Sequence, residues 1–421
     1  MKKTLLASLL TLVAFAMCAG EKPETRFAGE RTTVLRDGRE LEFRTCVAEQ
    51  LRAHSSARAE DVLKQCFQGA YGPGHVAGRR AEAESRFDAE YAAVAPRPEE
   101  PLFEVISPDF MRVNLGAWKM RGLPPKWLFN MFFASARRFD DGDALFARYL
   151  AEAEDALPPG LRAEFGRKKR ELSGGIPRHS GAYRSAERPS YRLVSTRFIH
   201  ALPVLQRAAA LPDAGKAVRV IAIDGRAASG KTTLARQLAL ITGAEAVHMD
   251  DFFLPAELRT AERYREPGGN VHYERFAEEV LPRLRDPRGF SYRVFDCSAM
   301  DYGRTAEVKP SAWRIVEGAY SLHPVFGDYA DLKVFYDIAP AEQKRRIVLR
   351  NGADRYRMFA ARWIPLEERY IEHFDVTKRA DLILGGGWPA SVGDADGGAA
   401  SAVEDGGIDA RIHSEKSQVE R

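Results

Sequence analysis

The chain has 421 residues, 45% of them hydrophobic and 29% charged, and its 63 lysines and arginines exceed its 59 acids by a formal charge of +4. At about 100–200 residues per domain, this composition suits two or three globular domains and excludes a wholly disordered chain, a collagen or a coiled coil. The small excess of positive charge gives no reason to expect a nucleic-acid partner. No apolar run reaches the roughly 20 residues that cross a bilayer, so no transmembrane span is expected.

Residues 1–20 have the pattern of a secretory or lipoprotein signal. Lys2 and Lys3 form a basic start, residues 5–17 are mostly apolar, and Cys18 follows them. The alternative is a start codon placed too far upstream, with Met17 as the true first residue.

Residues 33–211 are predicted to form a mainly helical domain. Helix-forming residues dominate Cys46–Cys66, Ala81–Ala93 and Ala144–Asp155, and an aromatic-rich helix is expected at Trp127–Phe133. No motif with a known mechanism assigns this domain a role, so acceptor binding, regulation and assembly all stay open.

From residue 216 the pattern changes to alternating strands and helices, which predicts a parallel sheet covered by helices. The predicted strands are Val218–Ile223, Ala244–Met249, Trp313–Val316, Leu332–Ile338 and Asp381–Leu384. The predicted helices are Lys231–Ile241, Tyr273–Leu284 and one from Pro340 to Asn351. This domain is expected to span residues 216–386, and the glycine-rich residues 387–421 are expected to form a flexible tail.

The segment Gly225–Thr232, with the sequence GRAASGKT, fits the pattern GxxxxGK[ST] between a predicted strand and a predicted helix. Glycines let such a loop aim successive backbone N–H groups at phosphate oxygens, and the helix adds its positive N-terminal end. We expect ATP to bind here, with Lys231 on the β- and γ-phosphates and the Thr232 hydroxyl on Mg²⁺. The predicted cradle consists of Gly225, Ala227, Ala228, Ser229, Gly230, Lys231, Thr232 and Thr233.

Acidic residues follow two of the predicted strands. Asp250 and Asp251 follow the second strand, and Glu317 ends the third. In an open parallel sheet, reacting groups belong at the carboxyl ends of the strands beside the phosphate site. A carboxylate there can accept the proton of an attacking hydroxyl or hold a metal ion, so Thr232, Glu317 and Asp250 are the predicted Mg²⁺ site.

The predicted helix after the fourth strand is rich in basic residues, and more follow it. Mobile guanidinium groups can close over a phosphoryl group and spread its charge. Arg350 and Arg355 are the predicted catalytic residues among them, and the alternative is a solvated helix face. The whole group is Lys344, Arg345, Arg346, Arg350, Arg355 and Arg357.

The segments DGRAASGKTT, HMDDFF and VEGAYSLHP, with the basic group after them, resemble the uridine kinase and phosphoribulokinase family of P-loop kinases over residues 216–386. The resemblance implies a five-stranded parallel sheet between helices, and transfer of the ATP γ-phosphate to a hydroxyl of a small metabolite, with a nucleoside preferred. The strand-end aspartate of the family corresponds to Asp250, which is the predicted base, with Asp251 as its substitute.

The same family places acceptor-binding residues after the second strand and before the third. In this chain those segments are residues 265–273 and 292–296, and the candidates are Asp251, Arg265, Tyr273, Arg293 and Asp296. Asp-Asp-Phe-Phe is also similar to nicotinamide riboside kinases, so that acceptor or another small alcohol stays open. A different class, an ATPase or nucleotide switch that acts on the N-terminal domain, is the other alternative. The expected partner is a small-molecule phosphate acceptor, and a homo-oligomer stays open. Because ATP is scarce outside the cytoplasm, a cytoplasmic protein is expected.

Overall fold

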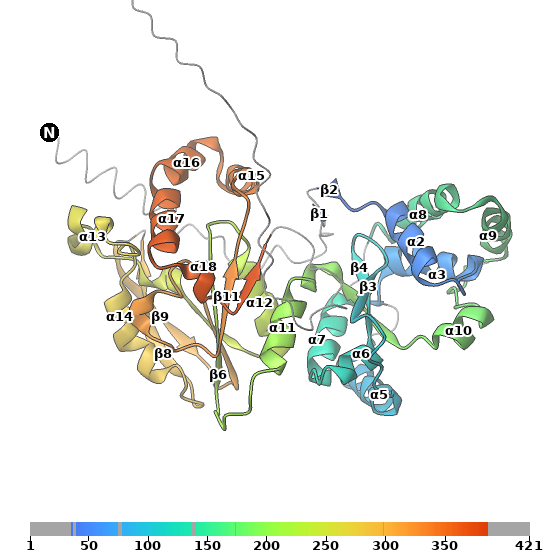
Figure 1. The fold of residues 1–421 in the computed structure, drawn as a ribbon, viewed down its shortest axis with the longest axis horizontal. Helices are drawn as coiled ribbons and strands as arrows, with labels where there is room; N and C mark the ends of the chain where they lie inside the picture. The colour runs from blue at the N-terminus through green and yellow to red at the C-terminus, as the bar shows by residue number, and fades with distance from the viewer. Residues whose placement is uncertain are drawn as a thin grey trace, which may run out of the picture.

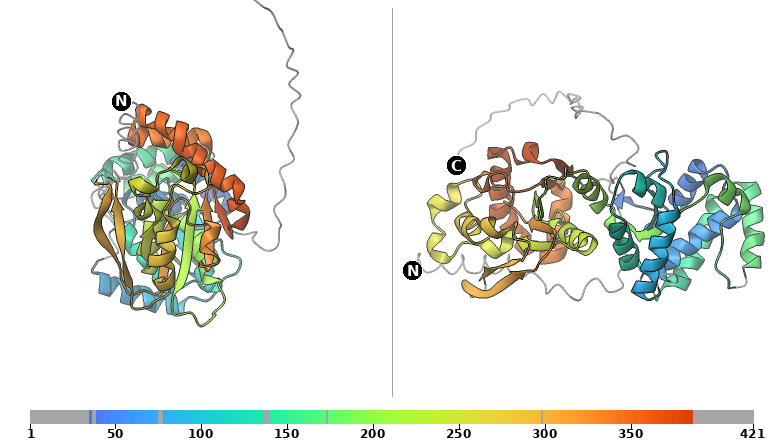
Figure 2. Two further views of the ribbon diagram at one scale, coloured as in Figure 1. Left: turned by 90° about the vertical axis from the view of Figure 1, so that its left-hand side faces the viewer. Right: turned by 90° about the horizontal axis from the view of Figure 1, so that it is seen from below.

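The computed structural model describes residues 35–36, 39–74, 78–136, 140–172, 174–297 and 299–385 (Figure 1). The predicted signal segment 1–20 and the predicted tail 387–421 lie outside these residues. Among the described residues, no helix is both long and apolar enough to cross a membrane. The elements before residue 211 lie at one end of the molecule and those after residue 219 at the other (Figure 2).

The N-terminal half is mainly helical, as predicted, but it also contains a three-stranded antiparallel sheet in the order β3-β4-β5. The strands are β3 (Phe103–Val105), β4 (Phe110–Asn114) and β5 (Tyr191–Ser195), and a short pair, β1 (Leu35–Arg36) and β2 (Arg39–Glu40), precedes them. The helices are α2 (Phe43–Ala53), α3 (Ala59–Tyr71), α5 (Arg80–Ala93), α6 (Leu115–Met120), α7 (Pro125–Ser135), α8 (Gly142–Ala156), α9 (Pro159–Glu171), α10 (Gly181–Glu187) and α11 (Ala201–Ala209). The expected helical stretch Cys46–Cys66 is therefore two helices, α2 and α3.

The C-terminal half is built on a five-stranded parallel sheet in the order β12-β11-β6-β10-β7, which confirms the predicted fold class. Its strands are β6 (Arg219–Gly225), β7 (Glu245–His248), β10 (Trp313–Glu317), β11 (Leu332–Tyr336) and β12 (Leu382–Leu384). Helices cover both faces of β6, so every residue of this strand after Arg219 is buried, and a run of apolar residues is what such a strand requires.

The register brings three strand ends to one edge of the sheet. Glu317 at the end of β10 lies opposite Ile223 of β6 on one side and opposite His248 of β7 on the other. The chain leaves β6 into the GRAASGKT loop and then enters helix α12 (Lys231–Thr242). The loop and the strand-end acids therefore share one edge.

An antiparallel hairpin that the strand–helix pattern did not predict follows helix α14 (Tyr273–Glu279). Its strands are β8 (Phe290–Asp296) and β9 (Asp301–Val308). The predicted helix Tyr273–Leu284 is shorter than expected and continues as a 3₁₀ turn, Leu281–Arg283, because Pro282 has no backbone N–H to donate. The short helix α13 (Ala261–Arg265) lies before α14.

A group of helices follows β11, and its first members, α15 and α16, lie above the sheet in Figure 1. It contains α15 (Pro340–Asn351), α16 (Ala353–Met358), a π-helical turn at Phe359–Trp363, α17 (Ile364–His373) and α18 (Val376–Arg379). We call α15 to α17 the cap helices. They carry the basic residues predicted to act on the phosphates.

One hydrophobic core runs through both halves of the molecule. It joins Trp127 of α7 and Val204 of α11 to Leu234 and Leu238 of α12. Polar contacts cross the same boundary: Asn130 Nδ2 donates to the Ile241 carbonyl at 2.9 Å, and Gln237 Nε2 donates to the Arg197 carbonyl at 2.8 Å. The N-terminal half therefore packs directly on the helix that begins at the GRAASGKT loop.

Candidate phosphotransfer site

The GRAASGKT loop bends sharply away from the end of β6, and its first residue has no room for a side chain. Gly225 has a φ of 142°, and a Cβ atom there would lie 2.0 Å from the carbonyl oxygen of Tyr336 on β11. Gly230, with a φ of 114°, caps the start of α12. Both positions require glycine, so the backbone explains the two glycines of the motif.

The lysine of the motif lies across this loop. Its Nζ donates to the carbonyl oxygens of Gly225 at 2.6 Å and Arg226 at 2.8 Å, and the side chain is only 9% exposed. The positive end of α12 lies next to the ammonium group because Lys231 is the first residue of that helix. The loop can therefore offer one buried cation and a helix N-terminus to an anion.

The cap helices hold the outer side of the loop. Glu367 of α17 accepts the backbone N–H of Ala227 at 2.8 Å, and Gln343 of α15 donates to the Ala227 carbonyl at 3.1 Å. Arg226 forms a bidentate ion pair with Glu368, with distances of 2.6 Å and 2.9 Å. The shape of the loop thus depends on α15 and α17.

One arginine of the predicted basic group contacts the loop, and it is not one of the two that the sequence singled out. Arg346 Nη1 donates to the carbonyl of Ser229 at 3.0 Å. Arg350, one turn further along α15, is exposed and bonds to Asn351 at 2.9 Å, and Arg355 on α16 is half-buried. Arg346 and Arg350 are one helical turn apart and lie on the same face of α15. The helical periodicity of the sequence therefore could not predict which of them contacts the loop.

Glu317 connects the loop to β7. Its Oε2 accepts the Thr232 hydroxyl at 3.1 Å, and its Oε1 lies 2.6 Å from His248 Nδ1. Burial lowers the pKa of His248, but the hydrogen bond and the charge of Glu317 outweigh burial, so that the pKa is raised. His248 was not predicted as a site residue, although it stands in the HMDDFF segment.

The Glu317 carboxylate and the Thr232 hydroxyl suit Mg²⁺ bound as it is in nucleotide sites. Among the described residues no group of three His, Cys, Asp or Glu side chains forms a metal cage. Mg²⁺ usually keeps several waters and takes one or two carboxylates plus substrate phosphates. The buried Glu317 carboxylate beside the Thr232 hydroxyl fits that role.

The two strand-end aspartates have different surroundings. Asp251 is buried and accepts the Tyr292 hydroxyl of β8 at 2.7 Å. Solvent reaches the Asp250 side chain, but the protein around it still dehydrates the carboxylate in part, and the charge of Glu317 repels it. These two effects raise the pKa of Asp250 to about 6, against the opposing effect of Lys231. Asp250 is therefore the carboxylate that is open and poised to take a proton near neutral pH.

Asp224, the last side chain before the loop, was not predicted as a site residue. Its buried carboxylate accepts hydrogen bonds from the backbone N–H groups of Gly225, Tyr320 and Leu322, at 2.7, 3.1 and 2.9 Å, and from the Tyr370 hydroxyl at 2.8 Å. Burial raises its pKa in spite of these bonds. Through these hydrogen bonds, Asp224 links the end of β6 to the turn after β10 and to α17. An acid at the end of a buried strand was the signal for it.

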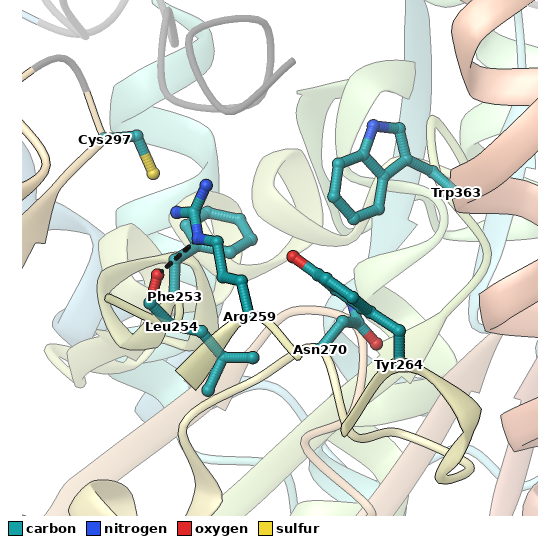
Figure 3. Close-up of a pocket in the computed structure, with 7 residues that line it drawn as sticks. All are labelled: Phe253, Leu254, Arg259, Tyr264, Asn270, Cys297 and Trp363. Carbon is teal, nitrogen blue, oxygen red and sulfur yellow. Dashed lines mark hydrogen bonds between the residues drawn. The ribbon is translucent and has the colours of Figure 1, made fainter. Parts of the chain in front are cut away.

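A pocket lies between the segment after β7, the end of β8 and the cap helices (Figure 3). Two buried polar atoms of its lining, Asn270 Oδ1 and Trp363 Nε1, have no hydrogen-bond partner among the described residues. Figure 3 shows the rings of Trp363 and Tyr264 on one side and Arg259, bonded to the Leu254 carbonyl at 2.7 Å, on the other. The lining residues are Phe253, Leu254, Arg259, Tyr264, Asn270, Cys297 and Trp363.

Most of the predicted acceptor-binding residues have partners elsewhere. The Tyr273 hydroxyl accepts from Arg263 at 2.8 Å, Arg265 pairs with Glu262 at 2.7 Å, and Arg293 pairs with Glu279 at 2.5 Å. Asp296 accepts the Ala299 N–H at 3.4 Å. None of the four lines the pocket, although Asn270 falls within the predicted stretch 265–273.

The strand order and the GxxxxGKT loop between the central strand and α12 define a P-loop nucleotide-binding protein. The chain is similar to the structure of a possible uridine kinase from Bacillus stearothermophilus, with 21% identity and a TM-score of 0.35 over 44% of this chain and 97% of that one. It is also similar to a candidate fructose transport system kinase from Silicibacter sp. TM1040, with 26% identity and a TM-score of 0.35 over 45% of this chain and 98% of that one. No protein-family model matches the chain.

Proposed function

We propose that this chain is an ATP-dependent phosphotransferase that moves the γ-phosphate of ATP to a hydroxyl of a small metabolite, with a nucleoside as the first acceptor to test. One observation supports this more than any other. A glycine-lined phosphate loop with a buried lysine shares a sheet edge with Asp250, an open carboxylate whose pKa is raised to about 6. A protein that only binds nucleotide has no need of such a base.

In the proposed reaction, the acceptor lies in the pocket with its hydroxyl toward Asp250. Asp250 accepts the hydroxyl proton as the oxygen attacks the γ-phosphorus in line, and the bond from phosphorus to the β-phosphate oxygen breaks. Lys231 and an arginine of the cap helices, Arg346, Arg350 or Arg355, neutralise charge on the phosphoryl group. Thr232 and Glu317 would hold Mg²⁺, with Asp250 nearby, and the ion would supply further charge neutralisation on the phosphates.

The direct test is a screen with γ-labelled ATP and Mg²⁺. Nucleosides, nicotinamide riboside and simple sugars or alcohols are offered separately, and label transfer to each is measured. Transfer to a hydroxyl of one class identifies the acceptor. Release of inorganic phosphate at the same rate with and without every acceptor would refute the kinase proposal and favour an ATPase or switch.

The proposed base predicts the pH dependence of turnover. Asp250 works as a carboxylate, so kcat at saturating ATP should fall about tenfold per pH unit below pH 6 and level off above about pH 7. An aspartate with an ordinary pKa would keep full activity down to about pH 5. A profile that stays flat from pH 7 to pH 5 would exclude Asp250 as the base.

The raised pKa of Glu367 leads to a second prediction, which concerns how ATP binding depends on pH. Burial raises the pKa of Glu367 to about 7, and its carboxylate accepts a loop N–H beside Lys231. A negative charge there opposes the phosphates, so Glu367→Gln should tighten ATP binding about tenfold at pH 8. At pH 6 wild type is mostly protonated, so the two proteins should bind alike. Calorimetric titration at both pH values checks this, and equal affinities at pH 8 would contradict it.

A further inference from the structure

A second group of buried polar side chains lies in the N-terminal half, where α3, β4 and β5 meet residues 177–180. We call it the Tyr191 cluster; it consists of Asp61, Lys64, Gln68, Arg112, His179 and Tyr191. No part of the proposed phosphotransfer reaction uses it.

A chain of hydrogen bonds runs through the cluster in a fixed direction. His179 Nδ1 lies 2.7 Å from Asp61 Oδ1, and His179 Nε2 lies 2.7 Å from the Tyr191 hydroxyl. Burial lowers the pKa of His179 to about 4, so the ring is neutral and carries one proton. Because a carboxylate only accepts, that proton is on Nδ1, and Tyr191 must donate to Nε2. Gln68 Nε2 in turn donates to the Tyr191 oxygen at 2.9 Å.

Arg112 lies beneath this chain and has no ion-pair partner among the described residues. The side chain is 2% exposed, and its guanidinium lies 4.9 Å from the centre of the Tyr191 ring. Its three nitrogens donate only to amide oxygens, those of Gln50 at 3.1 Å and of Gln68 at 2.9 and 3.2 Å. A guanidinium has five N–H groups, so two remain for another acceptor.

Lys64 adds a second cation without a carboxylate in the described part of the chain. Its Nζ has one long contact, 3.5 Å to the Pro177 carbonyl, and the residue is half-buried. Burial and the charge of Arg112 both lower the pKa of Lys64. The charge of Arg112 thus opposes the Lys64 ammonium, and a bound anion would relieve that repulsion.

The nearby acids are already engaged. Asp61 accepts from His179, from the Ser180 hydroxyl at 2.6 Å and from two backbone N–H groups. Glu104 lies 2.6 Å from His54, whose pKa is raised. Burial lowers the pKa of Arg112, but Tyr191, Tyr183 and the charges of Glu104 and Asp61 raise it overall. A buried cation without a direct ion pair is still costly, and neither Arg112 nor Lys64 has one among the described residues.

We propose that the Tyr191 cluster binds a small phosphate monoester or inorganic phosphate, held by the two spare N–H groups of Arg112 and by the Lys64 ammonium. Arginine suits bidentate contact with phosphate, and two cations match a group that carries about −1.5 to −2 at neutral pH. Lys64 and Tyr191 are half-buried, and Arg112 behind them is buried. This inference does not depend on the proposed phosphotransfer.

The test uses the full chain with Lys231→Met, so that phosphate binding at the P-loop is suppressed. Inorganic phosphate and glycerol phosphate are titrated by calorimetry at pH 7.5. We expect both to bind, and Lys64→Met added to this background should weaken binding about tenfold or more, since it removes a charged hydrogen bond. Lys168→Met is the matched control, because Lys168 pairs with Glu60 at 3.0 Å on the same half, and it should bind as before.

Tyr191→Phe gives an independent arm if Lys64→Met fails to fold. It keeps the ring against the Arg112 guanidinium but frees Gln68 and His179, so phosphate binding should weaken and the His179 imidazole NMR signals should move. No binding by the Lys231→Met chain at millimolar phosphate would overturn the proposal. Binding that is unchanged by both Lys64→Met and Tyr191→Phe would overturn it equally.

Discussion

Asp250→Asn should lower phosphoryl transfer by about 100- to 10,000-fold and leave the affinity for magnesium-complexed ATP nearly unchanged. The amide has almost the same shape as the carboxylate but cannot take the hydroxyl proton. Asp250 has no role in shaping the loop, which is held by Glu367, Gln343 and Arg346 instead. Single-turnover transfer to the acceptor found in the screen and calorimetric ATP titration measure the two effects separately.

Asp251→Asn is the control for that experiment. The Tyr292 hydroxyl donates to Asp251, and an asparagine oxygen can still accept that bond. We therefore expect Asp251→Asn to retain most of the transfer activity. If Asp251→Asn abolished transfer while Asp250→Asn did not, the roles of the two aspartates would have to be exchanged.

Lys231→Met should weaken ATP binding and transfer together, by about 100- to 1,000-fold. Methionine fills a similar volume but removes the buried ammonium that crosses the loop, and the other loop contacts with the phosphates would be backbone N–H groups. Titration with a fluorescent ATP analogue measures the loss. Lys216→Met is the control, because Lys216 pairs with Asp331 away from the loop at 2.6 Å and should bind ATP normally. If Lys231→Met bound ATP as tightly as wild type, the loop would not be the site that binds the triphosphate.

The central sheet could be predicted from the sequence because its signals are local. Strand β6 is apolar from Val220 to Ile223 and ends at a glycine that β11 approaches closely, and the loop motif then fixes the start of α12. Sheet β3-β4-β5 and hairpin β8-β9 gave no comparable signal. Their strands pair across turns or across long stretches of helix, so each depends on a partner that the local pattern does not name.

The site was predictable in part for the same reason. Lys231, Thr232, Glu317 and Asp250 stand at ends of elements that the pattern locates, and the parallel register brings those ends together. The pocket residues Asn270 and Trp363 are far apart in the chain and meet only when the cap helices fold over the sheet. Which arginine touches the loop likewise depends on how α15 is placed, so Arg346 could not be separated from Arg350.

The hydrophobic core that the two halves share has a consequence for expressing either half alone. Leu234 and Leu238 of α12 are covered by side chains such as Trp127 from the other half. A truncation between residues 211 and 216 would leave these leucines exposed to water on the nucleotide-binding fragment. Such a fragment should aggregate. The two halves should therefore be produced as one chain, because they differ from independent domains that a flexible linker joins.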